Sequence, residues 1–478
     1  MMSRHGWWLL AAAGLTLLLL LRRVGRRVFR RWIWRQALRT RRELGFRLNP
    51  ITVTRKQRLK AELLADPDLS SRVASMVTET GRDEASLLAD VSLYLDEIIP
   101  NFNLITTYGF GKQLAGWALR TCYRVRIGRS AEAALNRIPR DASVVYVMNH
   151  RSNADYLLVA FLLSSRVSIS YAVGEWARVW PLERLFRSFG SFFVRRRFRD
   201  PLYHAVLERY VQRAVAQGTT QGIFIEGGLS RDGRLQGPKL GLLDYMLRAG
   251  AKDLVFIPVG INYDRVVEDS NLVREALGKP RRSPLALLRR TSLWLLGLIW
   301  RGATGRFHRF GYAVANFGQP IHARAALEGV DLRALDWEAR RPLLEAVADS
   351  LLRAVSTEVP IPPVAAVAWA FRNLGAEAPG RAQLRDHLLD VLAAAQERNL
   401  PLYLPRGSFQ RTFEVGLRVL LLRRILVAQE GQLLLPPHKT PLLDYYAHSV
   451  EHLLGSLRLP RPKAPDPSQR RHTDRPGI

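Results

Sequence analysis

The sequence predicts an α/β fold, in which strands and helices alternate around one sheet. Short apolar runs, each followed by a polar turn, occupy residues 144–148, 223–225 and 254–257. Helical patterns separate these runs, for example at 203–215 and 240–248. Because polar groups that follow neighbouring strands gather at one edge of a sheet, we expect the three turns to share a single site.

The N-terminus predicts a membrane attachment over residues 1–45. Residues 7–21 are an apolar stretch of 15 residues, about 22 Å long as a helix and so shorter than the roughly 30 Å hydrocarbon core. Ten arginines and no acidic residue follow between 22 and 42, with apolar residues at helical spacing. This pattern is typical of a short anchor that continues into an amphipathic interfacial helix, with the rest of the chain in the cytoplasm. A cleaved signal peptide is the alternative, but it would carry its charge before the apolar run.

Residues 46–130 are expected to form a helical subdomain. Asp83 can cap a helix that ends at Pro100. The apolar face of that helix would hold Leu87, Leu88, Val91, Leu95 and Ile98.

The most informative stretch is 147–156, in which His150 stands five residues before Asp155. The turn after the first apolar run should lift His150 out of the core, with Ser152 or Asn153 capping the next helix. A carboxylate on one imidazole nitrogen fixes the tautomer, and the other nitrogen can then accept a proton from an alcohol. A helix-capping aspartate beside a hydrogen-bonded histidine is the alternative interpretation of this spacing.

Three further blocks follow in order. Residues 190–196 end an aromatic stretch in Arg195 and Arg196, residues 222–234 contain paired glycines and arginines, and residues 254–264 contain Pro258. Each block alone has a plain interpretation, such as a solvated basic run, an ordinary turn or a strand end.

The four blocks together resemble the membrane-bound glycerol-3-phosphate acyltransferases of bacteria, within the glycerolipid acyltransferase family. The resemblance covers roughly residues 94–319, and parts of 351–371 and 443–454 are also similar to the family's C-terminal region. It implies a mixed sheet flanked by helices in an acyltransferase domain at 131–325. It also implies transfer of a fatty acyl group from acyl-CoA or acyl carrier protein to the 1-hydroxyl of glycerol 3-phosphate.

The same resemblance implies a role for each site residue. His150 would be the general base and Asp155 its orienting partner. The substrate-binding residues would be Arg195 or Arg196 and Arg231 for the phosphate, Glu226, Gly227 and Ser230 around the acceptor, and Pro258 at the acyl-donor pocket. Arginine suits phosphate because its guanidinium makes bidentate charge-assisted hydrogen bonds.

One position departs from the family pattern. The family usually has arginine in a Gly-x-Arg-Ser-Arg sequence where this chain has Leu229. A lost charge-assisted contact is worth about 1.5–3 kcal/mol, enough to raise KM or to change the acceptor. Lysophosphatidate and dihydroxyacetone phosphate therefore remain alternative acceptors, and a non-catalytic membrane-binding relative is the alternative from another class.

The rest of the chain is expected to be a helical C-terminal region at 326–459 and a disordered tail at 460–478, which has almost nothing apolar to bury. Helices are expected at 336–355, 380–396 and 442–457, whereas 409–425 is ambiguous. The apolar stretch 293–300, flanked by arginines, is either an interfacial segment or a core helix.

Composition defines the partners. The chain has 478 residues with 72 Lys and Arg against 42 Asp and Glu, a net charge of +30, and one cysteine, Cys122. We expect an anionic membrane surface, acyl-CoA or acyl carrier protein as partners, but no specific nucleic acid, since no motif spaces aromatic residues for base stacking. No metal or other cofactor is expected, because a thioester already carries a good leaving group.

These expectations combine into one mechanism and one location. The catalytic domain would lie on the cytoplasmic face of the inner membrane. His150 would take the hydroxyl proton, and backbone amides at the start of the following helix would stabilise the oxyanion.

Overall fold

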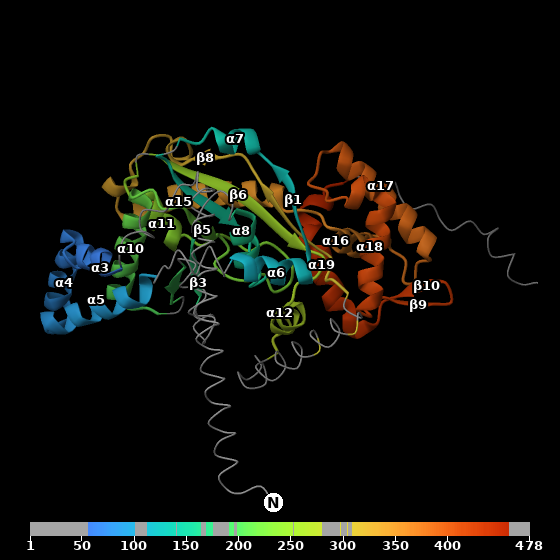
Figure 1. Ribbon diagram of the computed structural model, residues 1–478, viewed down its shortest axis with the longest axis horizontal. Helices are drawn as coiled ribbons and strands as arrows, with labels where there is room; N and C mark the ends of the chain where they lie inside the picture. Colours follow the sequence, from blue (N-terminus) through green and yellow to red (C-terminus); the bar gives the residue numbers. More distant parts are fainter. Residues whose placement is uncertain are drawn as a thin grey trace, which may run out of the picture. The chain divides into compact units, whose positions relative to one another are not determined.

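The computed structural model describes residues 56–100, 112–139, 141–163, 169–174, 191–195, 198–251, 253–279, 297, 304 and 308–457. The predicted anchor at 1–45, the segment 293–300 apart from residue 297, and the tail at 460–478 lie outside this range. The chain divides into two compact units, one with Met1–Trp117 and Leu163–Tyr210, the other with Ala118–Leu162 and Val211–Ile478 (Figure 1). Among the described helices, none has the length and apolar character needed to cross a bilayer.

The first unit contains three consecutive helices, α3 (Lys56–Leu64), α4 (Pro67–Thr80) and α5 (Glu84–Ile98). Local signals define their ends: Asp66 accepts hydrogen bonds from two amides at the start of α4, and Gly81 with φ 66° ends it. The predicted cap of α5 is confirmed, since the Asp83 side chain accepts a hydrogen bond from the Ser86 amide. The predicted apolar face is buried except at Leu88, which is 39% exposed.

Two short parallel strands, β3 (Ser170–Gly174) and β4 (Phe192–Val194), also belong to the first unit. Two helices are divided between the units, α6 (Lys112–Cys122) and α10 (Pro201–Ala216). The predicted helical pattern at 203–215 corresponds to α10.

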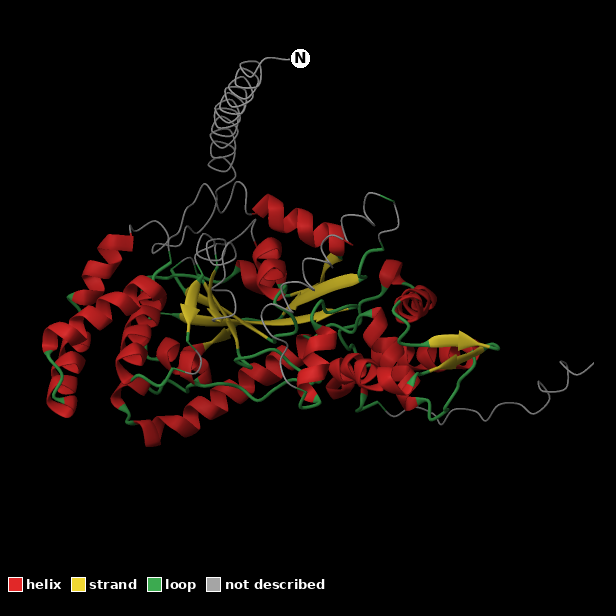
Figure 2. Cartoon of the chain, turned by 90° about the horizontal axis from the view of Figure 1, so that it is seen from below, coloured by secondary structure: helices red, strands yellow, loops and turns green. Residues whose placement is uncertain are grey.

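The second unit is built on a mixed sheet, as predicted (Figure 2). Its strands run in the order β1 (Arg124–Ser130), β7 (Tyr312–Phe317), β6 (Leu254–Tyr263), β2 (Ser143–Met148) and β5 (Gln221–Phe224), and β8 (Ile321–His322) also pairs with β6. The β1–β7, β2–β6 and β2–β5 pairs are parallel, whereas β7 and β8 run antiparallel to β6. Every residue of β2, β5, β6 and β7 is buried, which explains their nearly continuous apolar sequences.

Strand β6 is longer than the predicted run at 254–257. It continues through Pro258 to Tyr263, so that the proline lies inside the strand and not at its end. The antiparallel partner of β6 changes there from β8, which pairs up to Phe256, to β7, which pairs from Val259 onward. Pro258 lacks an N–H, and this change of partner is where the sheet tolerates its absence.

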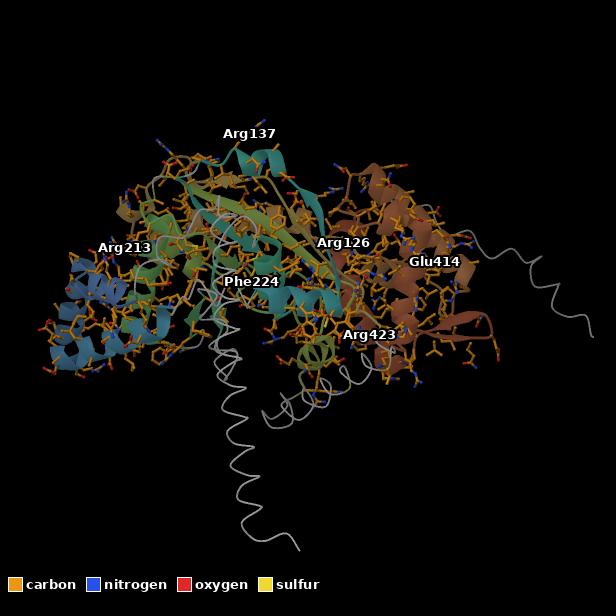
Figure 3. All side chains as sticks on the ribbon, viewed as in Figure 1. Arg126, Arg137, Arg213, Phe224, Glu414 and Arg423 are labelled. Atoms are coloured by element: carbon orange, nitrogen blue, oxygen red, sulfur yellow. The ribbon has the colours of Figure 1, made fainter. Side chains whose placement is uncertain are left out.

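Strand β1 is largely exposed and carries three arginines, Arg124, Arg126 and Arg129 (Figure 3 labels Arg126). Charged side chains on an edge strand discourage pairing with another chain. The smaller helices of this unit are α7 (Glu132–Asn136), α8 (Asp155–Leu163), α11 (Gly241–Leu247), α12 (Asp269–Ala276) and α14 (Ala323–Ala326). All of these except α14 are labelled in Figure 1.

The C-terminal part of the second unit is helical, as predicted. Its long helices are α15 (Trp337–Glu358), α16 (Pro363–Asn373), α17 (Arg381–Glu397), α18 (Phe409–Leu422) and α19 (Thr440–Leu454). The hairpin β9 (Val427–Gln429) and β10 (Gln432–Leu434) and the 3-10 turns Pro405–Gly407 and Pro437–Lys439 connect helices of this set. The 3-10 turn Leu332–Ala334 precedes α15. Helix α16 is buried from Pro363 to Phe371 and packs against α17, α18 and α19, which makes it the centre of this layer. The segment 409–425, ambiguous in sequence, is therefore mostly helix.

A buried ion pair joins these helices to α12 at the end of the sheet. Arg423, just after α18, lies 2.6 Å from a carboxylate oxygen of Asp269 and donates a hydrogen bond of 2.7 Å to the Tyr446 hydroxyl of α19. The Tyr446 hydroxyl in turn donates to Asp269. The three elements are thus held together through largely buried polar contacts, and the loss of one partner would leave a charge without its counter-charge.

Candidate active site

The candidate site begins where β2 ends. The side-chain amide of Asn149 accepts a hydrogen bond of 2.7 Å from the Ile261 amide and donates one of 2.9 Å to the Ile261 carbonyl. Both groups are buried. The first residue of the turn is therefore locked to β6.

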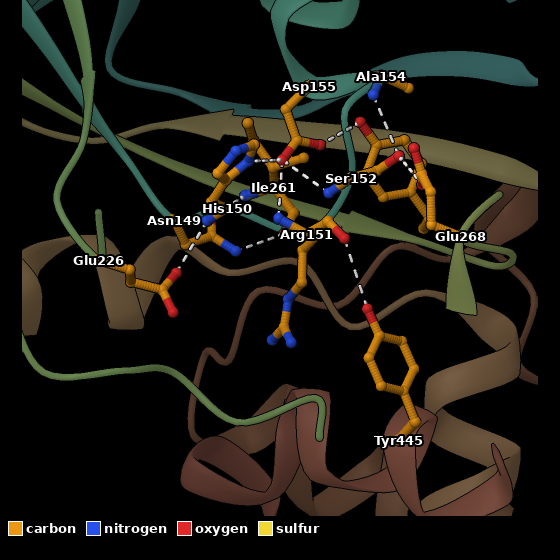
Figure 4. Close-up of polar contacts among 11 residues, drawn as sticks. Asn149, His150, Arg151, Ser152, Ala154, Asp155, Glu226, Ile261, Glu268 and Tyr445 are labelled. Carbon is orange, nitrogen blue, oxygen red and sulfur yellow. Dashed lines mark hydrogen bonds and ion pairs between the residues drawn. The ribbon is translucent and has the colours of Figure 1, made fainter. Parts of the chain in front are cut away.

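His150 and Asp155 meet as predicted (Figure 4). His150 Nδ1 lies 3.0 Å from Asp155 Oδ2. The same oxygen accepts hydrogen bonds from the amides of Arg151 at 2.7 Å and Ser152 at 3.0 Å, and Oδ1 accepts one from the Tyr263 hydroxyl at 2.6 Å. A carboxylate that accepts this many donors places the imidazole proton on Nδ1 and the lone pair on Nε2.

Two details of the predicted turn are wrong. His150 is not lifted out of the core, since it is 1% exposed. Helix α8 begins at Asp155, and the Ser152 hydroxyl accepts the Ala154 amide and donates to Glu268 Oε2 at 2.7 Å instead of capping the helix. The backbone amides of Arg151 and Ser152, between His150 and α8, donate to the Asp155 carboxylate because it folds back over the turn.

Aromatic rings hold the imidazole in place. The ring of Phe224, the last residue of β5, stacks on His150 with centroids 3.9 Å apart and an angle of 21° between the planes. Tyr156 meets both rings edge-on, at 5.5 Å from His150 and 4.8 Å from Phe224. This packing restricts the ring and excludes water from the His150–Asp155 pair.

Glu226 ties the His150 turn to the loop after β5. Its Oε1 accepts the His150 amide at 2.8 Å, and its Oε2 accepts the Gln236 amide at 2.7 Å. Burial raises the pKa of Glu226 to about 7, although the positive charge of Arg151 opposes the shift. Both carboxylate oxygens of Glu226 thus accept hydrogen bonds from backbone amides, a role that the sequence did not indicate.

Three other predicted residues follow Glu226 in this loop, and one of them, Ser230, contacts His150. Gly227 has φ 65°, and a Cβ there would lie 2.6 Å from a side-chain carbon of Lys239. The Ser230 backbone N–H donates to the His150 carbonyl at 3.0 Å, while the Ser230 hydroxyl donates to the Arg234 carbonyl within the loop. The Arg231 side chain is 53% exposed and lies 3.5 Å from Glu275.

Arg195 belongs to the first unit. Its guanidinium forms a two-pronged ion pair with Glu97, with Nε 2.8 Å from Oε1 and a second contact to Oε2. The ring of Phe198 lies 4.7 Å from the same guanidinium. Arg196 lies outside the described residues.

Arg151 was not predicted as a site residue, yet it is only 1% exposed. Its guanidinium donates to the Gly233 carbonyl and, at 3.1 Å, to the Ser449 carbonyl of α19. Gly233 has φ 92°, and a Cβ there would lie 2.0 Å from the Tyr445 carbonyl oxygen. The C-terminal helix therefore packs directly against the candidate site. The chain has many arginines, so the only sequence signal for Arg151 is that it directly follows His150.

Two family models match consecutive regions of this chain. A family model described as "Acyltransferase" matches residues 130–262, the region that contains β2, β5 and β6. A second, "Glycerol-3-phosphate acyltransferase C-terminal region", matches residues 295–456, which include α15 to α19. The first match defines the class as an acyltransferase-type α/β protein. The chain is thus similar to an acyltransferase over residues 130–262 and to the C-terminal region of glycerol-3-phosphate acyltransferases over residues 295–456.

Curated relatives are similar to part of the chain. A glycerol-3-phosphate acyltransferase of Shewanella loihica is 29% identical over 317 residues, which cover 64% of this chain and 38% of the relative. One of Shewanella putrefaciens is 31% identical over 289 residues, or 59% of this chain and 33% of the relative. The chain thus matches between 33% and 38% of the length of these relatives.

A solved structure of a 1-acyl-sn-glycerophosphate acyltransferase from Thermotoga maritima overlays 62% of this chain and 97% of its own length. The sequence identity is 17% and the TM-score is 0.29. Such an overlay supports no detailed comparison of the two folds.

Proposed function

We propose that this protein transfers a fatty acyl group from acyl-CoA or acyl carrier protein to the sn-1 hydroxyl of glycerol 3-phosphate, with lysophosphatidate as product. The observation that carries the proposal is the buried His150–Asp155 pair at the end of β2, with Nδ1 3.0 Å from the carboxylate. The curated relatives named glycerol-3-phosphate acyltransferase support the choice of acceptor.

The proposed reaction is a direct transfer without an acyl-enzyme. His150 Nε2 takes the proton of the 1-hydroxyl as its oxygen attacks the thioester carbonyl carbon. The C–S bond then breaks, and the thiolate leaves with the proton that His150 returns. Asp155 holds the imidazole and stabilises its protonated form. No metal or cofactor takes part in this scheme.

The binding roles remain those that the family resemblance implies. Arg231, half-exposed beside Ser230, is proposed to bind the phosphate, with Arg195 or Arg196 as further cations. Glu226 and Gly227 shape the acceptor side by holding the loop, and Pro258 lies at the acyl-donor pocket. Arg195 would first have to share or leave its ion pair with Glu97.

The proposed setting is the cytoplasmic face of the inner membrane. The arginine-rich segment at 22–42 would bind anionic lipid, which keeps the enzyme beside its acyl chains. The net charge of +30 also suits the phosphates of coenzyme A or an acidic carrier protein.

The test is an acyl-transfer assay on membranes that contain the full chain. Labelled palmitoyl-CoA is offered with glycerol 3-phosphate, to the wild type and to His150→Ala. Loss of the base should lower turnover by roughly 100-fold or more, as expected for general-base catalysis. His438→Ala, a change in an exposed turn before α19, is the matched control and should keep full activity. Near-normal turnover by His150→Ala would refute the mechanism.

A second candidate acceptor follows from Leu229. Because leucine replaces the arginine usual in the family, the alternative acceptors are lysophosphatidate and dihydroxyacetone phosphate. The same assay with these acceptors in parallel separates the cases: His150-dependent product from only one of them assigns the acceptor. If no product forms with any of these acceptors, and none forms with acyl carrier protein as donor, the result would favour a non-catalytic membrane-binding relative.

A further inference from the structure

The two carboxylate oxygens of Asp155 have different partners. Oδ2 binds His150 Nδ1 and the amides of Arg151 and Ser152, all within five residues of Asp155. Oδ1 accepts the hydroxyl of Tyr263, which is 108 residues away in sequence, at 2.6 Å. The turn thus organises one oxygen by itself, while the sheet holds the other.

The position of Tyr263 follows from the register of β6. Asn149 locks Ile261 by two hydrogen bonds, and Tyr263 comes two residues later in the same strand, on the same face. Tyr263 also pairs with Ala313 of β7 and has no exposed surface. The two hydrogen bonds between Asn149 and Ile261 therefore also place the Tyr263 phenol against Asp155.

Tyr263 remains a hydrogen-bond donor at any working pH. Burial, together with the negative charge of Asp155, raises its pKa well above the usual value. Among the described residues, other ionisable groups near the His150–Asp155 pair are Arg151 and Glu226 from the neighbouring loops, Glu268 before α12, and Tyr156 of α8. Burial raises the pKa of Glu226 and of Glu268, so that the phenol adds a donor where negative charge is already crowded.

We propose that Tyr263 is a positioning residue that holds Asp155 against the sheet and draws part of its negative charge, which keeps His150 in the neutral, basic form. This inference rests on the proposed function, because it assumes that His150 is the general base. Tyr263 touches Asp155 and not the reacting atoms, so its effect should pass entirely through the His150–Asp155 pair.

The first variant is Tyr263→Phe. Without the phenol, the charge on Asp155 is less shared, so the imidazolium of His150 becomes more stable. The acidic limb of the profile of kcat/KM against pH should move up by about one pH unit. At neutral pH kcat should fall roughly 10-fold to 100-fold, as for the loss of a hydrogen bond to a charged group. KM for both substrates should change less than about threefold.

Tyr123→Phe is the matched control. Tyr123 is also buried, its ring centroid lies 5.5 Å from that of Tyr263, and its hydroxyl donates to the Arg265 carbonyl at 2.7 Å. The change removes a buried tyrosine hydroxyl without touching Asp155. Its pH profile should coincide with that of the wild type, even if the protein is somewhat less stable.

A second substitution keeps the hydroxyl and should move the acidic limb of the profile of kcat/KM against pH in the opposite direction. Fluorotyrosine incorporated at position 263 is a stronger hydrogen-bond donor than tyrosine, so the acidic limb should move to lower pH. This variant also serves if Tyr263→Phe does not fold. Profiles that coincide with the wild type in both variants, beside an inactive His150→Ala, would overturn the role of Tyr263 alone. Full activity of His150→Ala would overturn the proposed function and this inference with it.

Discussion

At the scale of single residues, Glu226 shows how a buried carboxylate can act on the backbone. One oxygen accepts the amide of His150 and the other that of Gln236. The two amides belong to loops that follow different strands, β2 and β5. A group with two acceptors is needed at this position, because each amide would otherwise be buried without a partner.

We therefore predict that Glu226→Gln, although similar in shape, damages the site. One acceptor becomes an NH2 donor that faces a backbone N–H. The free energy of unfolding should fall by about 1–3 kcal/mol, and kcat roughly 10-fold or more, because the His150 turn loses its anchor. Urea unfolding and the acyl-transfer assay measure the two effects. Gln236→Ala keeps the backbone amide that binds Glu226 and should behave like the wild type. A fully active Glu226→Gln would show that the turn does not need this anchor.

At the scale of elements, helix α19 and the loop after β5 form one contact surface. Arg151 links the Gly233 carbonyl to the Ser449 carbonyl, and His448 Nδ1 lies 3.0 Å from the Asp232 carbonyl oxygen. The loop carries Ser230 and Arg231, to which we assign acceptor binding. The C-terminal region should therefore affect how tightly the acceptor binds.

Gly233→Ala tests this contact. A Cβ at φ 92° and 2.0 Å from the Tyr445 carbonyl oxygen cannot be accommodated, so the loop must move away from α19. We expect KM for glycerol 3-phosphate to rise roughly 10-fold, with strain of about 1–3 kcal/mol that thermal unfolding can measure. Gly218→Ala, at φ 72° with nothing within 4 Å of the new Cβ, is the control for strain without overlap. Equal KM values for both variants would contradict a role of α19 in acceptor binding.

At the scale of the whole molecule, buried carboxyl groups should make stability depend on pH. Asp264 at the end of β6 accepts the Tyr312 amide of β7 at 2.8 Å and the Val364 amide of α16 at 2.9 Å. It thereby joins the sheet to the central C-terminal helix. Burial raises the pKa of Asp264 from 3.8 to about 7.

The sign of the effect follows from proton binding. Between pH 4 and about 7 the folded protein holds a proton on Asp264 that the unfolded chain releases, so the contribution of Asp264 to stability is fully present below about pH 4 and is lost as pH rises to about 7. One group contributes about 1.4 kcal/mol per pH unit within this window. Asp264→Asn resembles the protonated form and cannot titrate. With each pH unit its free energy of unfolding should therefore fall by about 1.4 kcal/mol less than that of the wild type. Urea unfolding from pH 5 to 7 measures the slopes, with Asp336→Asn at the exposed cap of α15 as control. Parallel curves for wild type and Asp264→Asn would refute the prediction.

Much of the architecture could be predicted because it depends on local order. Apolar runs predicted β2, β5 and the start of β6, and a side-chain cap predicted the start of α5. The helical stretch 336–355 corresponds to α15. The helix periodicity likewise predicted α10, α17 and α19. Leu88 and the length of β6 were missed, since exposure and strand partners are set by neighbours distant in sequence.

The sequence by itself determined the His150–Asp155 pair, because five residues of turn suffice to fold the carboxylate back onto the ring. It also determined the ordered blocks that carry the family resemblance. The tertiary structure alone decided what surrounds that pair: Tyr263 from 108 residues away, Glu226 on two backbone amides, and Arg151 bound to a helix 298 residues further on. Such contacts arise from strand register and helix docking, which depend on the whole buried core and leave no local pattern in the chain.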